Sequence, residues 1–413
     1  MHFNIKTHVA LMALSLPYLA SSSSSSLSPI PITLSSDTLP FSITKSTTEG
    51  DPNYTAPIFP ILPFHKYPQN PILTANPDHD WESAYIYNPA ALVLNETIFL
   101  LYRAQNASKT SSIGLAWSSD GYHFTRLSRP ILYATEPWEA GGGTEDPRIV
   151  RVNGTFYLTY TAYDLGTPRL CIATSEDLVQ WTKHNPLFQS GPGTIFDHSK
   201  SGAIITEPSS DGLYHMFFGD SVFYHATSPD LLNWTATSTP FASPLLPWEN
   251  GLIEPGPPPV KTRDGRWLLI YNAMTTGADG YRATQYSVGQ MLLDVEDPAA
   301  KSPESQFSAS GRMNAEQIPI NHNPHSQSHP DPDSDSNKHR YHHTVELRTV
   351  PSFTDRPLAR LETPFLVPTT PEEESGQVDL VVFAEGLVQF RGKWFLYYGQ
   401  ADQSIGVAVA DVQ

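Results

Sequence analysis

Apolar and polar positions alternate along the chain in short runs that are separated by turn residues. Five runs are rich in aromatic residues and have the period of two that is typical of a β-strand. They are residues 99–104, 157–162, 215–220, 268–273 and 395–400. No stretch of the sequence combines a long 3.6-residue apolar period with helix caps. The pattern therefore predicts an all-β protein.

The five aromatic strands recur in a unit of about 50 residues. Ahead of most of them lies a turn such as Asn153-Gly154 or Asp264-Gly265, and ahead of the turn lies another apolar strand, so the two strands form a hairpin. Behind several comes a third strand that begins with small residues, often followed by Asp-x-x-x-Trp, as at 177–181. Five copies of a four-stranded antiparallel unit predict a five-bladed β-propeller.

Three stretches differ in composition from the repeats. Residues 1–20 contain an apolar run too short to span a membrane, which fits a secretory signal peptide, and residues 21–68 are a Ser- and Pro-rich extension. We expect the propeller to occupy residues 69–413, with a disordered, aliphatic-poor insertion at about 299–343. The insertion carries six histidines, but ordering a flexible loop around a metal opposes binding, and no metal site is predicted.

The charge balance excludes some partners. The 413 residues include 25 Lys and Arg against 42 Asp and Glu, for a formal net charge of −17. Nucleic acids and anionic membranes bind a positive face, so neither partner is expected. Five sequences fit the acceptor pattern for N-linked sugars, which matters only on an exported chain: those at Asn53, Asn95, Asn106, Asn153 and Asn233. The sequence therefore predicts a secreted, extracellular glycoprotein.

In a propeller, the innermost strands of the blades converge on one axial pocket, where polar residues can reach a common ligand. We expect the first strand of each repeat to be innermost. These strands carry charged residues that a buried strand would not otherwise contain, because an unpaired buried charge costs several kcal/mol. The polar stretches are Asn88-Pro89, Glu145-Asp146-Pro147-Arg148, residues 199–202 with Lys200, residues 254–259 with Glu254, and Ala384-Glu385-Gly386. The alternative is that Asp146 and Arg148 form a purely structural ion pair.

Three motifs lie on these repeats. The first is Glu145-Asp-Pro-Arg148 preceded by Gly143, the second is 256–260 followed by 265–271, and the third is 382–388 followed by 392–399. In this order they resemble glycoside hydrolase family 130, the five-bladed propeller enzymes that act on β-mannosides, and the resemblance runs from about Asn70 to the C-terminus. It implies an inverting reaction in which Asp146 is the general acid. The chemistry requires no cofactor.

The resemblance leaves the nucleophile open, because the family contains phosphorylases, which use inorganic phosphate, and hydrolases, which use water. Arg169 and Lys200 look like retained anion-binding positions, whereas the Tyr-His-Gly of many phosphorylases is Tyr271-Asn272-Ala273 here. The missing cation at Asn272 and the nearby glutamates lower the positive charge that phosphate needs. An exported phosphorylase would also release its sugar phosphate outside the cell.

We therefore predict a secreted inverting hydrolase of β-1,2- or β-1,4-linked manno-oligosaccharides or glycans. A β-mannoside phosphorylase that releases mannose 1-phosphate is the alternative, and a non-catalytic sugar-binding propeller is the third possibility. The expected partner is a carbohydrate, with inorganic phosphate only for a phosphorylase.

Individual roles follow from these positions. Glu254 and Glu207 are the first candidates for the base that activates water, and Glu385 follows them as a ligand of a sugar hydroxyl. Each glutamate has a structural alternative as the partner of a nearby cation. The other candidates for binding the substrate are Asn88, Arg103, Glu145, Arg148, Arg169, Lys200, Asp220, Asn272 and Asp402.

Overall fold

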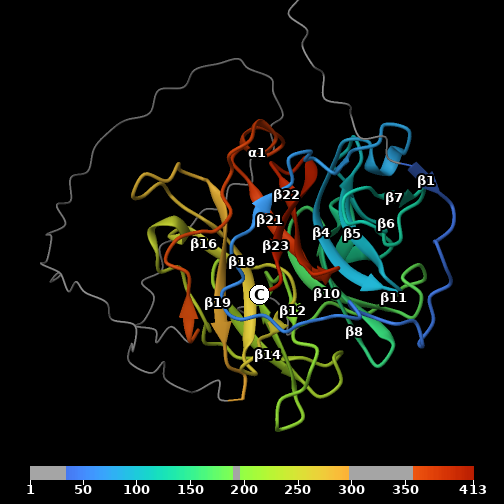
Figure 1. Ribbon diagram of the computed structural model, residues 1–413. Helices are drawn as coiled ribbons and strands as arrows, with labels where there is room; N and C mark the ends of the chain where they lie inside the picture. Colours follow the sequence, from blue (N-terminus) through green and yellow to red (C-terminus); the bar gives the residue numbers. More distant parts are fainter. Residues whose placement is uncertain (1–33, 189–195, 297–356) are drawn as a thin grey trace, which may run out of the picture. The chain divides into compact units, whose positions relative to one another are not determined.

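The computed structural model describes residues 34–188, 196–296 and 357–413, which consist almost entirely of strands and turns (Figure 1). The strands form five blades in chain order, and consecutive strands of a blade pair antiparallel. The five predicted aromatic runs coincide with the second strand of each blade. The prediction of an all-β, five-bladed propeller is confirmed. The predicted signal peptide and the insertion at about 299–343 lie outside the described residues.

Blades 1 and 2 share one nine-stranded sheet, because Ser111 pairs with Gly143 across the boundary between them. Blade 1 consists of β4 (Tyr85–Leu94), β5 (Thr97–Gln105), β6 (Ser111–Ser118) and β7 (Thr125–Leu127), with β1 (Leu34–Ser36) parallel to β7. Blade 2 consists of β8 (Gly143–Val152), β9 (Thr155–Tyr163), β10 (Pro168–Ser175) and β11 (Thr182–Lys183).

The other three blades are separate sheets. Blade 3 consists of β12 (Ala203–Ile204), β13 (Tyr214–Phe218), β14 (Tyr224–Ser228) and β15 (Thr235–Ala236). Blade 4 consists of β16 (Leu252–Pro255), β17 (Val260–Lys261), β18 (Trp267–Met274), β19 (Tyr286–Leu293) and β20 (Ala359–Arg360). Blade 5 consists of β21 (Val382–Phe390), β22 (Lys393–Gln400) and β23 (Ser404–Asp411), joined by β2 (His65–Lys66) and β3 (Leu73–Thr74).

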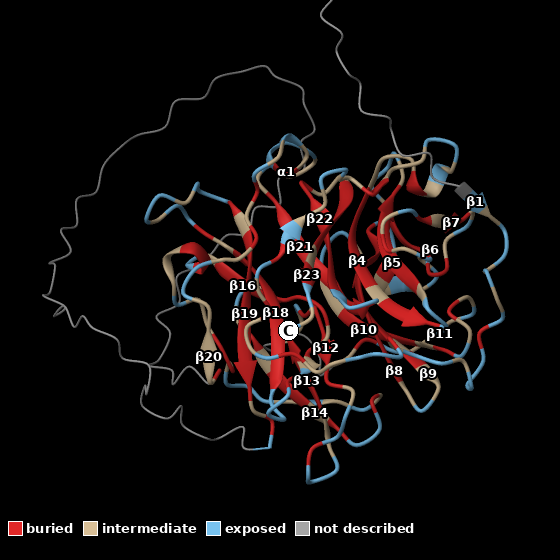
Figure 2. Ribbon diagram, viewed as in Figure 1, coloured by how far each residue is buried: buried red, intermediate tan, exposed pale blue. Residues whose placement is uncertain are grey.

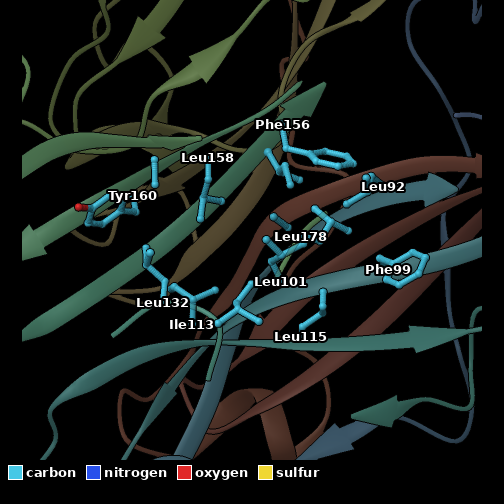
Figure 3. Close-up of a cluster of buried hydrophobic side chains, with 14 of the residues drawn as sticks. Leu92, Phe99, Leu101, Ile113, Leu115, Leu132, Phe156, Leu158, Tyr160 and Leu178 are labelled. Carbon is cyan, nitrogen blue, oxygen red and sulfur yellow. The ribbon is translucent and has the colours of Figure 1, made fainter. Parts of the chain in front are cut away.

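The faces of neighbouring blades pack through apolar side chains, while the connecting turns are exposed (Figure 2). Between blades 1 and 2, Leu101 and Leu115 contribute to the same buried cluster as Phe156, Leu158 and Tyr160 (Figure 3). All five side chains are fully buried. Each buried side chain of this size stabilises the fold by about 1.5–3 kcal/mol relative to exposure. This packing fixes the blades against one another and so fixes what lies at the axis.

Four blades contain the same buried hydrogen-bonded group, at the short helix before the innermost strand. The helices are η1 (Asp80–Glu82), η2 (Pro137–Glu139), η3 (Pro247–Glu249) and α1 (Pro371–Glu374). A glutamate of each helix accepts a hydrogen bond from a tyrosine of the second strand and pairs with a cation of the outermost strand. The sets are Glu82–Tyr102–Arg126, Glu139–Tyr160–Lys183, Glu249–Tyr271–Arg360 and Glu373–Tyr398–Lys66. Among the described residues, no helix is long and apolar enough to cross a membrane.

Residues 44–61 come before β2 in the chain and contact strands of blades 2, 4 and 5. The guanidinium of Arg151 in blade 2 donates to two backbone carbonyls of this segment. The side chains of Gln389 in blade 5 and Gln290 in blade 4 each exchange two hydrogen bonds with its backbone. Next along the chain, β2 and β3 pair with β23, so residues that the sequence analysis assigned to the extension contribute a strand to blade 5.

Candidate active site

The innermost strands of blades 1, 2 and 5 are irregular at the positions that the sequence singled out. The register of β4 on β5 shifts at Asn88, that of β8 on β9 shifts at Asp146, and that of β21 on β22 shifts at Glu385. A β-bulge turns a side chain out of the regular pattern of the sheet. Asn88 and Asp146 both have φ of 50°, in the left-handed region that Asn and Asp tolerate better than other non-glycine residues. The bulges explain how charged residues of buried strands reach one site.

Asp146 lies at the centre of a buried polar cluster. Its Oδ1 accepts hydrogen bonds from Asn88 Nδ2 and Arg103 Nη1, each at 2.9 Å. Its Oδ2 lies 3.1 Å from Lys200 Nζ. The same Asn88 amide nitrogen donates to Glu385 Oε1 at 3.1 Å. The cluster therefore joins the innermost strands of three blades and a lysine from the segment before β12.

Glu254 lies next to Asp146 in this cluster. Its Oε1 is 3.3 Å from Lys200 Nζ and 3.7 Å from Arg148 Nη2, and it accepts a hydrogen bond from the Ser201 hydroxyl. Because one ammonium group contacts both carboxylates, Asp146 and Glu254 face the same small region. The predicted proximity of Asp146 to a glutamate on another blade is present in the structure.

Arg148 and Arg103 pair with the two glutamates that flank Asp146. Arg148 is buried, donates to the backbone carbonyls of Pro255 and Gly256 in blade 4, and lies 3.0 Å from Glu385 Oε1. It pairs with Glu385 rather than with the side chain of Asp146, so the alternative of a structural Asp146–Arg148 ion pair is wrong. Arg103 reaches Glu145 Oε1 at 2.5 Å. Each arginine supplies the positive charge that offsets the burial of its carboxylate partner.

The cations and burial set the protonation of the carboxyl groups. Burial by itself would raise the pKa of Asp146, but Lys200, Arg103 and Arg148 outweigh it and lower the pKa below its usual value. This differs from the expectation that neighbours would hold the pKa of the general acid up. Burial raises the pKa of Glu145 to about 7 and that of Glu385 to about 8, against the nearby arginines. Near neutral pH, Glu145 and Glu385 can therefore hold a proton more readily than Asp146 can.

Asp220 and Asp402 border the cluster. Asp220 lies 3.0 Å from His198 Nε2 and lines a cavity of about 160 Å³. Its charge acts on Lys200 and Glu254. Burial raises the pKa of Asp402 to about 6, with opposition from Arg103. Binding of sugar hydroxyls by these two aspartates stays a prediction.

Three predicted site residues are not in the cluster. Glu207 is 53% exposed and pairs with Lys261 on the surface, so its prediction as a catalytic base is wrong. Asn272 is fully buried, and its amide exchanges two hydrogen bonds with the backbone of Ala384, so it joins blades 4 and 5 rather than facing a ligand. Arg169 is held at 2.6 Å by Asp164 and has no contact with the cluster among the described residues.

Two serines of the cluster were missed. The Ser111 hydroxyl accepts a hydrogen bond from Arg103 and donates to Glu145. The Ser201 hydroxyl contacts Glu254. Ser201 lies in the polar stretch 199–202, which the sequence analysis placed at the axis. A serine by itself does not indicate which carboxylate it contacts.

Two buried acceptor atoms of the cluster have no hydrogen-bond partner in the described part of the chain: Asn88 Oδ1 and Glu385 Oε2. A buried polar atom without a partner costs free energy, so such atoms mark places where a ligand can bind. Asn88 Oδ1 can accept a hydrogen bond, and Glu385 Oε2 can accept one when ionised or donate one when protonated, so a sugar hydroxyl can bind to either atom. Among the described residues, no group of three or more His, Cys, Asp or Glu is arranged to hold a metal ion.

Comparison with known proteins agrees with this architecture. The model of the family described as beta-1,4-mannooligosaccharide phosphorylase, glycoside hydrolase family 130, matches residues 63–308 and 334–413. The chain belongs to glycoside hydrolase family 130. The match covers all five blades and the residues of the cluster.

Individual relatives differ in the acceptor that their names imply. A 1,2-beta-oligomannan phosphorylase of Thermoanaerobacter sp. strain X514 is 28% identical over 86% of this chain and 99% of its own length. A glycosyl hydrolase from Bacteroides ovatus has 30% identity and a TM-score of 0.67, over 87% of this chain and 99% of that one. Another structure has 30% identity and a TM-score of 0.68, over 87% of this chain and 99% of that one. Its description states that this family of mannoside phosphorylases contains glycoside hydrolases that target beta-1,2 mannosidic linkages in Candida mannan.

The four curated relatives that match are all named as mannoside phosphorylases. They support the phosphorylase alternative better than the hydrolase that the sequence analysis put first. The charge argument behind that preference counted Glu207, which lies at the surface, and so overestimated the acidity of the site.

Proposed function

We propose that this protein is an inverting enzyme that cleaves β-mannosidic bonds of manno-oligosaccharides, with inorganic phosphate as the acceptor. The observation that carries the proposal is the buried cluster in which Asp146 contacts Asn88, Arg103 and Lys200 beside Glu254. Membership of the family and the names of the curated relatives support the substrate class.

The cluster has the parts that cleavage of a glycosidic bond needs. The leaving oxygen must receive a proton, and Asp146 is the residue that the family motif assigns to this step. Glu145 and Glu385 flank Asp146, and their raised pKa values let them hold a proton near neutral pH. The free acceptor atoms of Asn88 and Glu385 suit sugar hydroxyls. Inversion then requires the nucleophile to attack C1 from the opposite face of the ring.

Phosphate is favoured as this nucleophile by the cations of the cluster. Arg103 contacts Asp146, Arg148 contacts Glu385, and Lys200 contacts Glu254. The pKa values of Glu145, Glu254 and Glu385 are all raised, chiefly by burial. Protonation of these glutamates removes negative charge and leaves the cations to attract an anion.

Water is the second candidate, and one specific observation favours it. Arg169, a predicted anion-binding residue, is paired with Asp164 instead of facing the cluster. With fewer cations, the site binds phosphate less strongly. Water would then be the nucleophile, and Glu254 would be the base that activates it. The similarity to the Bacteroides ovatus glycosyl hydrolase supports the same alternative.

Removal of phosphate distinguishes the two acceptors. We expect cleavage of linkage-defined manno-oligosaccharides to fall to background in phosphate-free buffer and to recover with added phosphate, because phosphate is consumed stoichiometrically. Product chromatography should then show mannose 1-phosphate. Unchanged release of free mannose without phosphate would establish the hydrolase instead. Sulfate at equal ionic strength controls for a general salt effect.

We also propose that the chain is exported and carries N-linked sugars, as the sequence predicts. Asn53, Asn95, Asn153 and Asn233 are exposed, which leaves room for a sugar on the folded chain. Asn106 is half-buried, and its side-chain oxygen accepts hydrogen bonds from two backbone N–H groups of its own turn.

Expression through the secretory route of a eukaryotic host tests this proposal. We expect the secreted protein to lose mass on treatment with an enzyme that releases N-linked glycans. Peptide mapping should find sugar at the four exposed asparagines and least at Asn106. Replacement of the four by glutamine should abolish most of the mass change, and Asn106→Gln is the matched control. Secreted protein without any mass change would contradict the proposal.

A further inference from the structure

In each of the first three blades, one non-glycine residue of the cluster has left-handed backbone, as does Asp402 at its border. The φ values in these three blades are 50° for Asn88, 50° for Asp146 and 62° for Ser201. Such a conformation is unfavourable for these residues and persists where the surrounding structure holds it, often at functional sites. Asn88 and Asp146 direct their side chains to one another. Ser201 shares this backbone conformation, and its hydroxyl contacts Glu254.

The contacts of Ser201 show what its hydroxyl does. The residue is 1% exposed and lies just before β12. Its hydroxyl donates to Glu254 Oε1, the same oxygen that faces Lys200 Nζ at 3.3 Å and Arg148 Nη2 at 3.7 Å. A neutral, short side chain on a fixed backbone thus reaches the oxygen that both cations share. This contact restricts the rotation of the Glu254 carboxylate, because a second position of the carboxylate would leave the buried hydroxyl unpaired.

We infer that Ser201 is a positioning residue, which holds the Glu254 carboxylate in place for cleavage of the mannoside. The inference rests on the proposed function and holds for either acceptor. In phosphorolysis, a fixed Glu254 keeps Lys200 where it meets phosphate. In hydrolysis, it keeps the carboxylate where it meets water. Ser201 does not itself touch the reacting atoms in this assignment.

The hydroxyl also affects the protonation of Glu254. A hydrogen bond donated to a carboxylate favours the ionised form and lowers its pKa. Burial acts in the opposite direction and raises the pKa of Glu254. Loss of the Ser201 hydroxyl should therefore raise that pKa further. The charged and titratable groups that face Glu254 besides Ser201 are Lys200, Arg148, Asp146, Asp220, Glu385, Tyr286 and Asp402.

The variant Ser201→Ala tests the inference. We expect kcat to fall about tenfold, the effect of one hydrogen bond to a charged group. The KM for the mannoside should change less than about twofold, because a positioning residue acts after the sugar has bound. The acid limb of the pH–rate profile should move to higher pH. Ser199→Ala is the matched control, since that buried hydroxyl accepts from the backbone N–H of Leu170 and contacts no carboxylate in the described part of the chain.

A double-mutant cycle with Glu254→Gln shows whether Ser201 acts through Glu254. In the Glu254→Gln background, the loss from Ser201→Ala should be much smaller than in the wild type, because the carboxylate it positions is gone. Equal losses in both backgrounds, or a Ser201→Ala profile like that of Ser199→Ala, would overturn the inference.

Failure of the proposed function would look different. A wild-type protein that cleaves no mannoside, with or without phosphate, contradicts that proposal but leaves the contact measurable. The loss of melting temperature in Ser201→Ala should then be larger at pH values above the pKa of Glu254 than below it, since the hydroxyl favours the carboxylate. A loss independent of pH would show that Ser201 does not act on Glu254.

Discussion

The variant Asp146→Asn is expected to lose about 10²–10⁴-fold in kcat, the range that a general acid contributes. Asparagine has nearly the same shape and can still accept hydrogen bonds from Asn88 and Arg103, but it cannot donate a proton to the leaving oxygen. Binding of the manno-oligosaccharide should be retained. Single-turnover kinetics and calorimetric titration of the same protein sample measure the two properties separately.

The low pKa of Asp146 makes this test informative. Lys200, Arg103 and Arg148 outweigh burial and lower the pKa of Asp146, which favours its ionised form. Asp146 must therefore gain a proton before the glycosidic bond breaks. We expect the bound substrate to change the surroundings of Asp146 and so raise its pKa. Turnover like that of the wild type in Asp146→Asn would refute the assignment of Asp146 as the acid. Binding without turnover in both the wild type and the variant would instead indicate a non-catalytic sugar-binding propeller.

Asp177→Asn is the control for Asp146→Asn in the same blade. Asp177 accepts hydrogen bonds from the backbone N–H groups of Val179 and Gln180 in a turn on the outer side of blade 2. Asparagine can accept the same bonds, so the rate should stay within about twofold of the wild type. A comparable loss in both variants would point to a general effect on the blade.

The variant Arg148→Leu is expected to lower the free energy of unfolding by about 3–5 kcal/mol where Glu385 is ionised, the cost of leaving a buried charge without its partner. Arg148 is 1% exposed and contacts Glu385 in blade 5 and two backbone carbonyls in blade 4. Leucine removes these contacts and leaves the glutamate beside an apolar side chain. Denaturant unfolding at pH 8 and pH 5 measures the loss.

The pH dependence of this loss identifies its cause. Without Arg148, the pKa of Glu385, already raised to about 8 by burial, should rise further. The group is raised relative to the unfolded chain, so protonation stabilises the variant and the loss should be smaller at pH 5 than at pH 8. Arg151→Leu is the control on the same strand. The Arg151 guanidinium donates to two backbone carbonyls and lies over the Phe156 ring, and it acts on Glu49 through its charge alone, so its loss should be smaller, about 1–2 kcal/mol.

Local sequence pattern was sufficient for the blades. The aromatic runs with a period of two, and turns such as Asn153-Gly154, gave the second strand of every blade, because alternation along a strand is a local property. The buried glutamate of the short helices was not recognised, although Pro-Trp-Glu occurs at both 137–139 and 247–249. Its partners lie on the second and outermost strands, and no local pattern relates those positions.

The candidate site was predicted in part. Asn88, Glu145 and Asp146 meet as expected, because the first strands of blades 1 and 2 are innermost and irregular at these positions. Arg103 joins them from β5 and Lys200 from the segment before β12. Glu254 and Glu207 looked equivalent in the sequence. The structure separates them by burial, since Glu254 lies in the cluster and Glu207 pairs with Lys261 at the surface.

The sequence by itself determined the class of fold, the number of blades and most of the residues that carry charge to the axis. The tertiary structure alone decided which charges meet. Arg148 pairs with Glu385 across the axis rather than with Asp146, its neighbour in the motif. The physical reason is that ion pairing depends on distances between blades, and the apolar packing of whole sheets sets those distances.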